Sequence, residues 1–314
     1  MLELFACPAC GGDLSPAWTC RSCGSDYESA DAIPNLRVTS DARTETVRGF
    51  YQQAPFPGYP SNDSIEWLRA RAERSAFARL LDRAIPYDAC ILDAGCGTGQ
   101  MSLYLARADR IVIGADLTRS SLLLGAAAAR RFGVRGVQFV ETDLHRPGLR
   151  DGSFDVVYSS GVLHHTPDPR AAFARLARLT RPGGIIVLGL YNAFARIPLR
   201  VRRGLARVTG RIFFDPVLND RKNEPARREA WVRDQYQHPE EHRHTVGEVQ
   251  TWFEENRVDF VRCYPSAMLD DGGDDLFTAA TDTWAPEAWL AQLAWMKTLG
   301  HEGGLFVTVG RRVA

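Results

Sequence analysis

The 314-residue sequence lacks any stretch of about 18 apolar residues, so no segment of it is expected to span a bilayer. Its N-terminus, MLELFACPACGGDL, lacks the basic segment and long apolar stretch of a signal peptide, and we therefore expect a cytoplasmic protein. An excess of charge is also missing, because 38 basic residues balance 38 acidic ones. The overall charge thus gives no indication of nucleic acid or an anionic membrane as partner.

Cysteine is present in a pattern that does not favour disulfides. Four of the seven cysteines form two CxxC pairs, Cys7/Cys10 and Cys20/Cys23. Each pair makes a tight turn whose thiolates point to one place, so together they predict a tetrahedral Zn²⁺ site. Residues 1–38 are too few to build a core without such a link, and a site with four protein ligands leaves no position for substrate. We expect a structural zinc ion.

Strand-like and helical stretches alternate from residue 89 onward. Apolar strand-like runs occur at 89–95, 110–117, 137–144, 154–161 and 184–192, with two more at 257–265 and 304–312. Apolar strands separated by helices indicate a parallel sheet covered on both faces. The predicted fold class is α/β, with a Rossmann-like, doubly wound, seven-stranded and mostly parallel sheet.

Three segments flank or interrupt this alternation. Residues 39–63 contain three prolines among aromatic residues, and we expect a linker that lies on the main domain. The predicted catalytic domain, 64–314, starts with one helical stretch at 64–84. Residues 192–256 separate two strands and are too many for an ordinary loop, so they predict a helical cap over the active site that ends in a helix.

The segment ILDAGCGTGQ, residues 91–100, leads a strand through a glycine-rich turn into a helix. Glycines are needed at 95, 97 and 99 because a Cβ would block the turn and the approach of a ligand to the backbone. The dinucleotide fingerprint requires a further glycine at position 100, where this sequence has Gln. The turn therefore argues against a dinucleotide cofactor.

Acidic residues stand at the ends of the first three strands. Asp93 lies in the glycine segment, Asp116 ends the second strand, and Asp143 ends the third. At these places one carboxylate can accept hydrogen bonds from two ribose hydroxyls and another from an adenine amino group. Leu117 and Leu144 follow two of the acids and can hold the adenine ring between them.

Over roughly residues 88–192 the chain resembles the class I S-adenosylmethionine (SAM)-dependent methyltransferases, especially their small-molecule branch. The resemblance rests on LDAGCGTG, Asp116, TDL at 142–144, FDVVYSSGVLHHTPDP and LARLTRPGGIIVLGLYN. FYQQAPFPGY resembles the part of related enzymes that folds over SAM. The implied SAM-binding residues are Tyr51, Tyr59, Asp93, Gly95, Cys96, Gly97, Asp116, Leu117, Thr142, Asp143, Leu144, Ser159 and Ser160.

The cysteine-rich segment has a resemblance of its own. The pattern CPxCGGxL, CxxCGxxY and IPNL is similar to the small zinc-ribbon family related to the activator subunit of tRNA and protein methyltransferases. In some chains such a ribbon contacts RNA or a partner protein, so its role beyond structure stays open.

Candidate catalytic residues follow the fourth and fifth strands. His164 and His165 come where the methyl group of SAM is expected, and Tyr191 ends the next strand. Either histidine could act as a base, or the LHH segment could only position its loop. The cap holds a second cluster whose members are candidates for substrate contact or cap closure, namely Asp234, Tyr236, His238, Glu241, His242 and His244. His238 and His242 lie four residues apart, and on a helix they could bind a metal ion.

An arginine-rich stretch covers residues 196–211. Leu199, Val201, Leu205 and Val208 alternate with its arginines. It could be a solvated helix face, an amphipathic helix that touches a membrane or a lipid substrate, or a phosphate-binding surface for RNA.

The motifs favour a SAM-dependent methyltransferase that acts on a small or amphiphilic metabolite, because a large cap suits a buried ligand. One alternative is an RNA or protein methyltransferase that docks its polymer on the zinc ribbon. Another is an inactive SAM-binding regulator. The fourth strand ends in YSSGVLHH instead of the Asn/Asp-Pro-Pro-aromatic motif of many amino-methylating enzymes, which weakens base-amine methylation.

Overall fold

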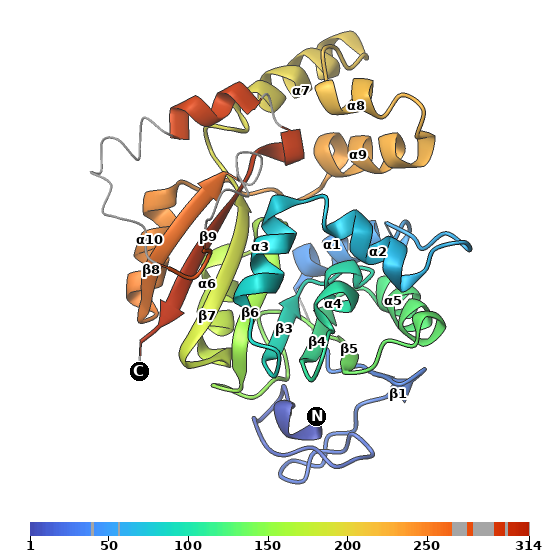
Figure 1. The fold of residues 1–314 in the computed structure, drawn as a ribbon, viewed down its shortest axis with the longest axis vertical. Coiled ribbons are helices and arrows are strands. Elements are labelled where there is room, and N and C mark those ends of the chain that lie inside the picture. Colours follow the sequence, from blue (N-terminus) through green and yellow to red (C-terminus); the bar gives the residue numbers. More distant parts are fainter. Residues whose placement is uncertain (39–40, 56, 266–274, 279–291, 299–300, 314) are drawn as a thin grey trace.

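The computed structural model describes residues 1–38, 41–55, 57–265, 275–278, 292–298 and 301–313 (Figure 1). Its strands are β1 (Ser29–Ala30), β2 (Ile33–Pro34), β3 (Cys90–Ala94), β4 (Ile111–Asp116), β5 (Val137–Glu141), β6 (Phe154–Ser160), β7 (Thr180–Tyr191), β8 (Val258–Pro265) and β9 (Leu305–Arg312). Its α-helices are α1 (Ala42–Gln52), α2 (Ile65–Ala72), α3 (Ala76–Ala84), α4 (Gln100–Leu105), α5 (Arg119–Phe132), α6 (Pro169–Leu179), α7 (Ile197–Thr209), α8 (Pro216–Asp220), α9 (Pro225–Gln237) and α10 (Val246–Glu255). Short 3-10 helices cover Leu2–Leu4, Leu163–His165, Trp295–Thr298 and His301–Gly304.

Seven strands form one sheet in the order β5-β4-β3-β6-β7-β9-β8. Neighbouring strands from β5 to β7 are parallel, whereas β9 runs antiparallel to both β7 and β8. The sequence prediction of a Rossmann-like, seven-stranded, mostly parallel sheet is thus confirmed. The bounds of each predicted strand agree with the observed bounds to within four residues.

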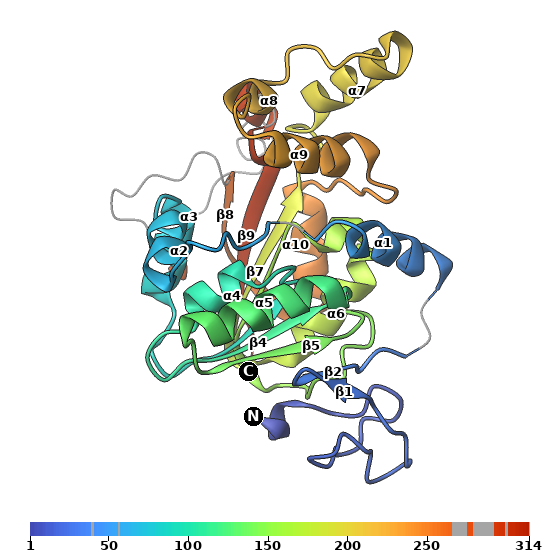
Figure 2. The same cartoon turned by 90° about the vertical axis from the view of Figure 1, so that its right-hand side faces the viewer.

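Two apolar layers cover the sheet (Figures 1 and 2). Ile91 of β3 packs in the layer that includes α3, α4 and α5, whereas the next residue, Leu92, packs in the layer of α6 and α10. Successive side chains of a strand point to opposite faces, so a run of apolar residues in a central strand is buried on both. The structure thus buries both faces of the central strands, as their continuous apolar sequences predict.

The helical stretch expected at 64–84 is two helices instead of one. α2 ends at Ala72, and α3 begins at Ala76 with Ser75 as its cap, whose Oγ accepts a hydrogen bond from the Ala78 N–H. Serine at this position satisfies an otherwise free amide, and it competes with continued helix. The helical pattern of residues 64–84 is thus divided into two helices at the Ser75 cap.

The N-terminal module, residues 1–38, packs on the edge of the sheet near β5. The Leu36 N–H donates to the Glu141 carbonyl, and the Ala6 N–H donates to Gly148. The Glu141 side chain is buried and lies 3.2–3.6 Å from the guanidinium groups of Arg37, Arg48 and Arg119. One carboxylate therefore joins the module, α1 and α5.

The segment between β7 and β8 contains four helices, which differ in their surroundings. α10 lies beside β8 and buries Val249, Trp252 and Phe253, so it belongs to the layer that covers the sheet. α7, α8 and α9 stand above the ends of β7 and β9, at the opposite end of the molecule from the N-terminal module (Figure 1). In the described part of the chain, no helix is long and apolar enough to span a membrane.

Candidate functional site

A cavity opens at the carboxyl ends of β3, β4, β5 and β6, and α1 forms one wall. Its lining comprises Thr44, Val47, Tyr51, Gly95, Gly97, Asp116, Leu117, Thr118, Ser121, Thr142, Asp143, Leu144, His145, Ser160, Gly161, Val162, His165, Thr166 and Pro167. In an open α/β sheet, ligands bind at this end, where neighbouring connections diverge. The cavity brings together nine of the thirteen residues that the sequence predicts for SAM.

The turn after β3 is glycine-rich for steric reasons that the structure makes specific. Gly95 has φ +79°, and a Cβ there would come within 2.3 Å of Val162 Cγ1. Gly99 also has φ +79°, and its Cβ would lie 2.6 Å from the Phe139 ring. Any other residue would be strained in its backbone and would displace these side chains. The glycines therefore keep the chain close to the neighbouring connections while leaving the cavity open.

Asp116 organises the first two connections. Its Oδ2 accepts a hydrogen bond from the Gly97 N–H at 2.8 Å, and its Oδ1 accepts from the Thr118 N–H at 2.8 Å and from the Thr118 hydroxyl at 2.5 Å. Burial raises the pKa of this carboxyl above its ordinary value, and the bonds from Thr118 and Gly97 oppose that shift. Two carboxylate oxygens offer about four acceptor positions, and three are filled here, so one ligand hydroxyl can bind directly and a second can take the place of the Thr118 hydroxyl.

Asp143 lies after β5 with a histidine partner that the sequence did not suggest. Its Oδ1 is 3.0 Å from His145 Nδ1 and accepts the His145 N–H at 2.9 Å. The hydrogen bond that the His145 ring donates to Asp143 raises the pKa of His145, against the effect of burial. Asp143 therefore faces the cavity as a hydrogen-bond acceptor whose position is fixed by its own loop.

Four predicted cofactor residues do not line the cavity. Asp93 lies beneath it and accepts a hydrogen bond from the Ser102 hydroxyl at 2.6 Å, and burial raises its pKa to about 7. Ser159 donates to the Ala94 carbonyl, and Tyr59 donates to the Thr98 carbonyl at 2.7 Å. Cys96 lies within the turn, and its side chain is likewise not part of the lining. These residues hold the turn and its neighbours in place.

Other lining residues are not among the predicted site residues, namely Thr44, Val47, Thr118, Ser121, His145, Gly161, Val162, Thr166 and Pro167. Thr44 and Val47 belong to α1, which begins after the cap residue Asp41. Together with Tyr51 they occupy positions i, i+3 and i+7, which lie on one face of a helix, and this spacing is the sequence signal that could have identified them. The expected linker, residues 39–63, therefore contains a helix whose one face lines the cavity.

His165 is the predicted catalytic residue that lines the cavity. Its Nδ1 is 2.8 Å from the Glu240 carbonyl, which can only accept, so Nδ1 carries the hydrogen and Nε2 has the free lone pair. Nε2 lies 4.0 Å from Asp234 Oδ1. Burial lowers the pKa of His165, and the Asp234 carboxylate acts in the opposite direction. The imidazole is therefore neutral at neutral pH and can accept a proton.

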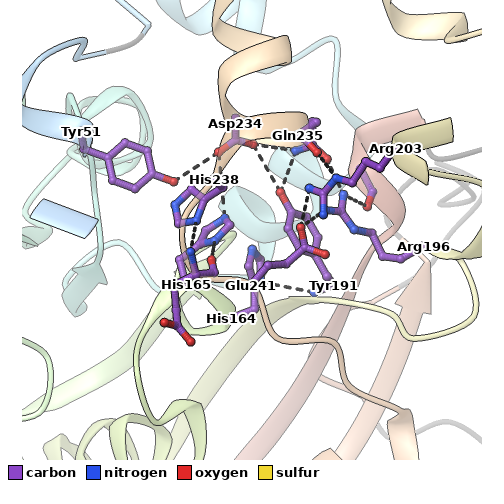
Figure 3. Close-up of polar contacts among 12 residues, drawn as sticks. Tyr51, His164, His165, Tyr191, Arg196, Arg203, Asp234, Gln235, His238 and Glu241 are labelled. Atoms are coloured by element: carbon purple, nitrogen blue, oxygen red, sulfur yellow. Dashed lines mark hydrogen bonds and ion pairs between the residues drawn. The ribbon is translucent and has the colours of Figure 1, made fainter. Parts of the chain in front are cut away.

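Asp234, on α9, belongs to the cap cluster noted in the sequence, and it is the centre of the polar contacts shown in Figure 3. The Tyr51 hydroxyl donates to its Oδ1 at 3.2 Å, and the Gln235 amide donates to its Oδ2 at 2.6 Å. Tyr191 lies 3.4 Å from the same Oδ2. Asp234 and Tyr51 also line a second hollow beneath α9, together with Phe50, Trp231 and Arg233. Tyr51 thus lines both hollows.

His164 and Tyr191 lie behind His165 and do not line the cavity. The His164 ring stacks on Tyr191 with ring centroids 3.7 Å apart, and its Nδ1 accepts the Tyr191 N–H. The Arg196 guanidinium lies over the Tyr191 ring, and its Nη2 donates a hydrogen bond to Glu241 Oε2 at 2.5 Å. Burial lowers the pKa of His164 well below its ordinary value. Both residues therefore support the cluster from behind His165 without lining the cavity.

The cap histidines do not form the metal pair that was considered for a helix. α9 ends at Gln237, so His238 and His242 are not on one helix, and His242 Nε2 lies 2.8 Å from Glu240. His244 pairs with Glu248, and Tyr236 donates to the buried Asp215. His238 instead stacks on His165 with ring centroids 3.7 Å apart.

A different set, His165, Asp234 and His238, places possible metal-binding atoms within 4.8 Å of one another. The Glu240 N–H donates to His238 Nδ1 at 3.1 Å, so a neutral His238 carries its hydrogen on Nε2 and has no free lone pair there. Burial lowers the pKa of His238 to about 2, which keeps it neutral. The donor pattern favours hydrogen bonding to a ligand over metal coordination.

The four cysteines of the CxxC pairs gather in the N-terminal module. Cys7 Sγ is 3.7 Å from Cys23 Sγ, and Cys10 Sγ is 3.5 Å from Cys20 Sγ. In a tetrahedral site with Zn–S bonds of about 2.3 Å, neighbouring sulfurs lie about 3.8 Å apart. The Ser22 and Cys23 N–H groups point at Cys20 Sγ, as expected for a thiolate. The arrangement fits four metal-bound thiolates.

The sheet order, the glycine turn and the acidic strand ends define the class I SAM-dependent methyltransferase fold. Residues 92–188 match the family model described as a methyltransferase domain. This part of the chain is thus similar to methyltransferase domains, and its sheet has their Rossmann-like fold.

Several proteins are similar to this chain. An uncharacterized protein of Synechococcus sp. is 27% identical over 253 residues, which cover 70% of this chain and 60% of that protein. A ubiquinone biosynthesis O-methyltransferase of Paracidovorax citrulli is 32% identical, over 38% of this chain and 51% of its own length. The chain therefore spans only about half to three fifths of these relatives.

Among solved structures, a phosphoethanolamine N-methyltransferase of Haemonchus contortus with bound S-adenosylhomocysteine (SAH) has a TM-score of 0.50 at 14% identity. The match covers 85% of this chain and 60% of that one. This likeness concerns the fold.

Proposed function

We propose that this protein transfers a methyl group from SAM to a hydroxyl group of a small or amphiphilic acceptor. The observation that carries the proposal is the cavity whose lining combines Gly95, Gly97, Asp116 and Asp143 with His165. In the proposed complex Asp116 accepts hydrogen bonds from both ribose hydroxyls, and Asp143 accepts one from the adenine amino group. Leu117 and Leu144 flank the ring, and the connection after Ser160 faces the methyl group.

The chemistry needs a base only where the acceptor atom carries a proton of high pKa. SAM, when bound, supplies a sulfonium methyl group that an acceptor oxygen attacks in line with the C–S bond. His165 Nε2, a lone-pair acceptor beside the cavity, takes the hydroxyl proton as the new O–C bond forms, while the C–S bond breaks and its electron pair stays on the sulfur of the leaving SAH. The imidazolium is then stabilised by Asp234 at 4.0 Å and by the Glu240 carbonyl at 2.8 Å. His165 is thus the catalytic base, and His164 and Tyr191 are positioning residues.

The acceptor is proposed to bind where the second hollow meets the cavity, beneath α9. Phe50, Tyr51 and Trp231 offer aromatic surface, and His238 Nε2 is a buried donor without a partner in the described part of the chain. Buried polar atoms of this kind cost free energy unless a ligand satisfies them. A hydroxyl-bearing, partly aromatic or apolar molecule fits these surroundings. The similarity to a ubiquinone biosynthesis O-methyltransferase agrees with this acceptor class.

For the N-terminal module we propose a zinc ribbon in which Cys7, Cys10, Cys20 and Cys23 hold one Zn²⁺. The metal would supply folding free energy to a segment too short for its own core. The module lies at the end of the molecule opposite to α7–α9 (Figure 1), which supports a structural role over a role in acceptor binding.

Methyl transfer can be tested with the purified chain, SAM labelled in its methyl group, and a metabolite extract. We expect a labelled low-molecular-weight product with the parent chain. The His165→Gln variant should bind SAM normally but form product 10²–10⁴-fold more slowly, the range typical for loss of a general base, as an order of magnitude. Label that appears in RNA or protein instead would contradict a small acceptor, and an unaffected rate in His165→Gln would contradict the base.

A further inference from the structure

The surface of α7 and the loop after it exposes an unusual amount of apolar side chain. Six of the ten large apolar side chains exposed in the described residues lie between positions 197 and 214, namely Ile197, Val201, Leu205, Val208, Phe213 and Phe214. The first four follow the spacing i, i+4, i+8 and i+11 and so form one stripe along the helix. Val208 is 87% exposed and Phe214 is 89% exposed. Contiguous exposed apolar surface of this kind marks an interaction site.

Arginine side chains border this stripe without acidic partners. Arg200, Arg207 and Arg243 line a groove with Ile197 and Val201, and across the described ranges none of these three arginines has an ion pair. Glu241 is the acidic residue in the groove, and it is already bonded to Arg196 and Arg203. Partial burial, and then the charge of Arg200, lowers the pKa of the Arg243 guanidinium. The groove therefore carries positive charge that an anion would compensate.

We propose that this surface, residues 197–214 with Arg243, docks on the surface of an anionic lipid bilayer. The apolar stripe and Phe213–Phe214 enter the region between headgroups and acyl chains, and Arg200, Arg207 and Arg243 bind lipid phosphates. A helix with an apolar stripe flanked by arginines, and too short to cross the bilayer, has the properties of an interfacial helix. The proposal adds a location to the proposed function and does not depend on it.

Two other occupants fit the surface less well. A second copy of the chain in a two-fold dimer would place the same unpaired arginines against one another, with like charges in contact. RNA would satisfy the arginines but would leave Val208 and Phe214 exposed to water. A lipid surface matches both properties, since it offers phosphates and an apolar interior within a few ångströms of depth.

The position of the surface in the fold is compatible with docking. α7 stands at the outer edge of the molecule, together with α8 and α9 and away from the sheet (Figures 1 and 2). The second hollow lies under α9, on the same end of the molecule. An amphiphilic acceptor could thus pass from the bilayer to Tyr51 and Asp234 without crossing the sheet.

The proposal is tested by co-sedimentation of the full chain with vesicles of phosphatidylcholine alone, or of phosphatidylcholine mixed with phosphatidylglycerol. We expect binding to the mixed vesicles that weakens as salt is raised. Arg200→Glu and Arg207→Glu should each weaken it at least fivefold, on the order expected for one arginine near an anionic surface. Val208→Asp combined with Phe214→Asp should abolish it. All of these side chains are exposed, so the variants should fold.

Matched controls on other surfaces separate docking from general effects. Trp67→Asp changes an exposed aromatic residue on α2, and Arg83→Glu reverses a charge on α3. Both should bind vesicles as the parent chain does. The proposal would be overturned by no binding to mixed vesicles, by equal losses in the controls, or by a concentration-dependent dimer that Phe214→Asp disrupts. Binding of RNA in place of vesicles would overturn it as well.

Discussion

Replacing Asp116 with alanine should weaken SAM binding by at least two orders of magnitude. In the proposed complex this carboxylate accepts hydrogen bonds from both ribose hydroxyls, and each bond to a charged acceptor contributes about 1.5–3 kcal/mol. Together they amount to about 3–6 kcal/mol, or roughly 10²- to 10⁴-fold in Kd. The change also removes the acceptor of the Gly97 and Thr118 N–H groups, so the glycine turn loses support and the loss should exceed the lower figure.

Isothermal titration calorimetry with SAH measures this loss directly. Asp88→Ala removes an exposed aspartate outside the cavity and should leave the affinity unchanged. An SAH analogue without ribose hydroxyls should bind the parent chain and Asp116→Ala with much closer affinities than SAH does. The assignment of Asp116 to the ribose is wrong if Asp116→Ala binds SAH as tightly as the parent chain. It is also wrong if the full penalty persists with the analogue.

Three further outcomes follow from the same geometry. The rate of product formation should fall when the pH is lowered below neutral. Burial lowers the pKa of His165, so the neutral imidazole is protonated, and lost as a base, only as the pH drops through that pKa. In a pH–rate profile of His165→Gln this decrease at acid pH should be absent. Cys20→Ser should reduce bound zinc, measured by atomic emission, and increase hydrogen exchange in residues 1–38, while SAH affinity should stay close to that of the parent chain. Glu141→Gln should lower the free energy of unfolding, measured in urea, by about 1–3 kcal/mol. The loss should be smaller than for a fully buried ion pair, because Arg48 and Arg119 keep part of their surface in water. An unchanged urea midpoint would contradict the role given to Glu141.

The sheet was predictable because its signals are local. Apolar runs such as β3 and β4 and the helices between them specify a buried parallel sheet without reference to distant residues. Helix boundaries depend on single side chains, and the Ser75 cap that separates α2 from α3 was not recognised within an otherwise helical pattern. The antiparallel pairing of β9 with β8 and β7 joins segments far apart in the sequence, so no local pattern specifies it.

The candidate site was predictable where one short segment carries it. The glycine turn and Asp116 act through backbone and strand-end geometry that the sequence encodes directly. Asp234 reaches His165 only because α9 folds back beside Tyr51 of α1 and His165, and no spacing in the sequence links residues so far apart. The tautomer of His238 likewise depends on the Glu240 N–H, which only the three-dimensional structure places beside Nδ1.

The most direct test of the central claim is a crystal structure of the chain with SAH. The ribose hydroxyls should lie within hydrogen-bond distance of Asp116, with adenine between Leu117 and Leu144 near Asp143, and with the sulfur facing His165. Clear density for SAH at another place, with the cavity beside Asp116 empty of ligand, would contradict the account.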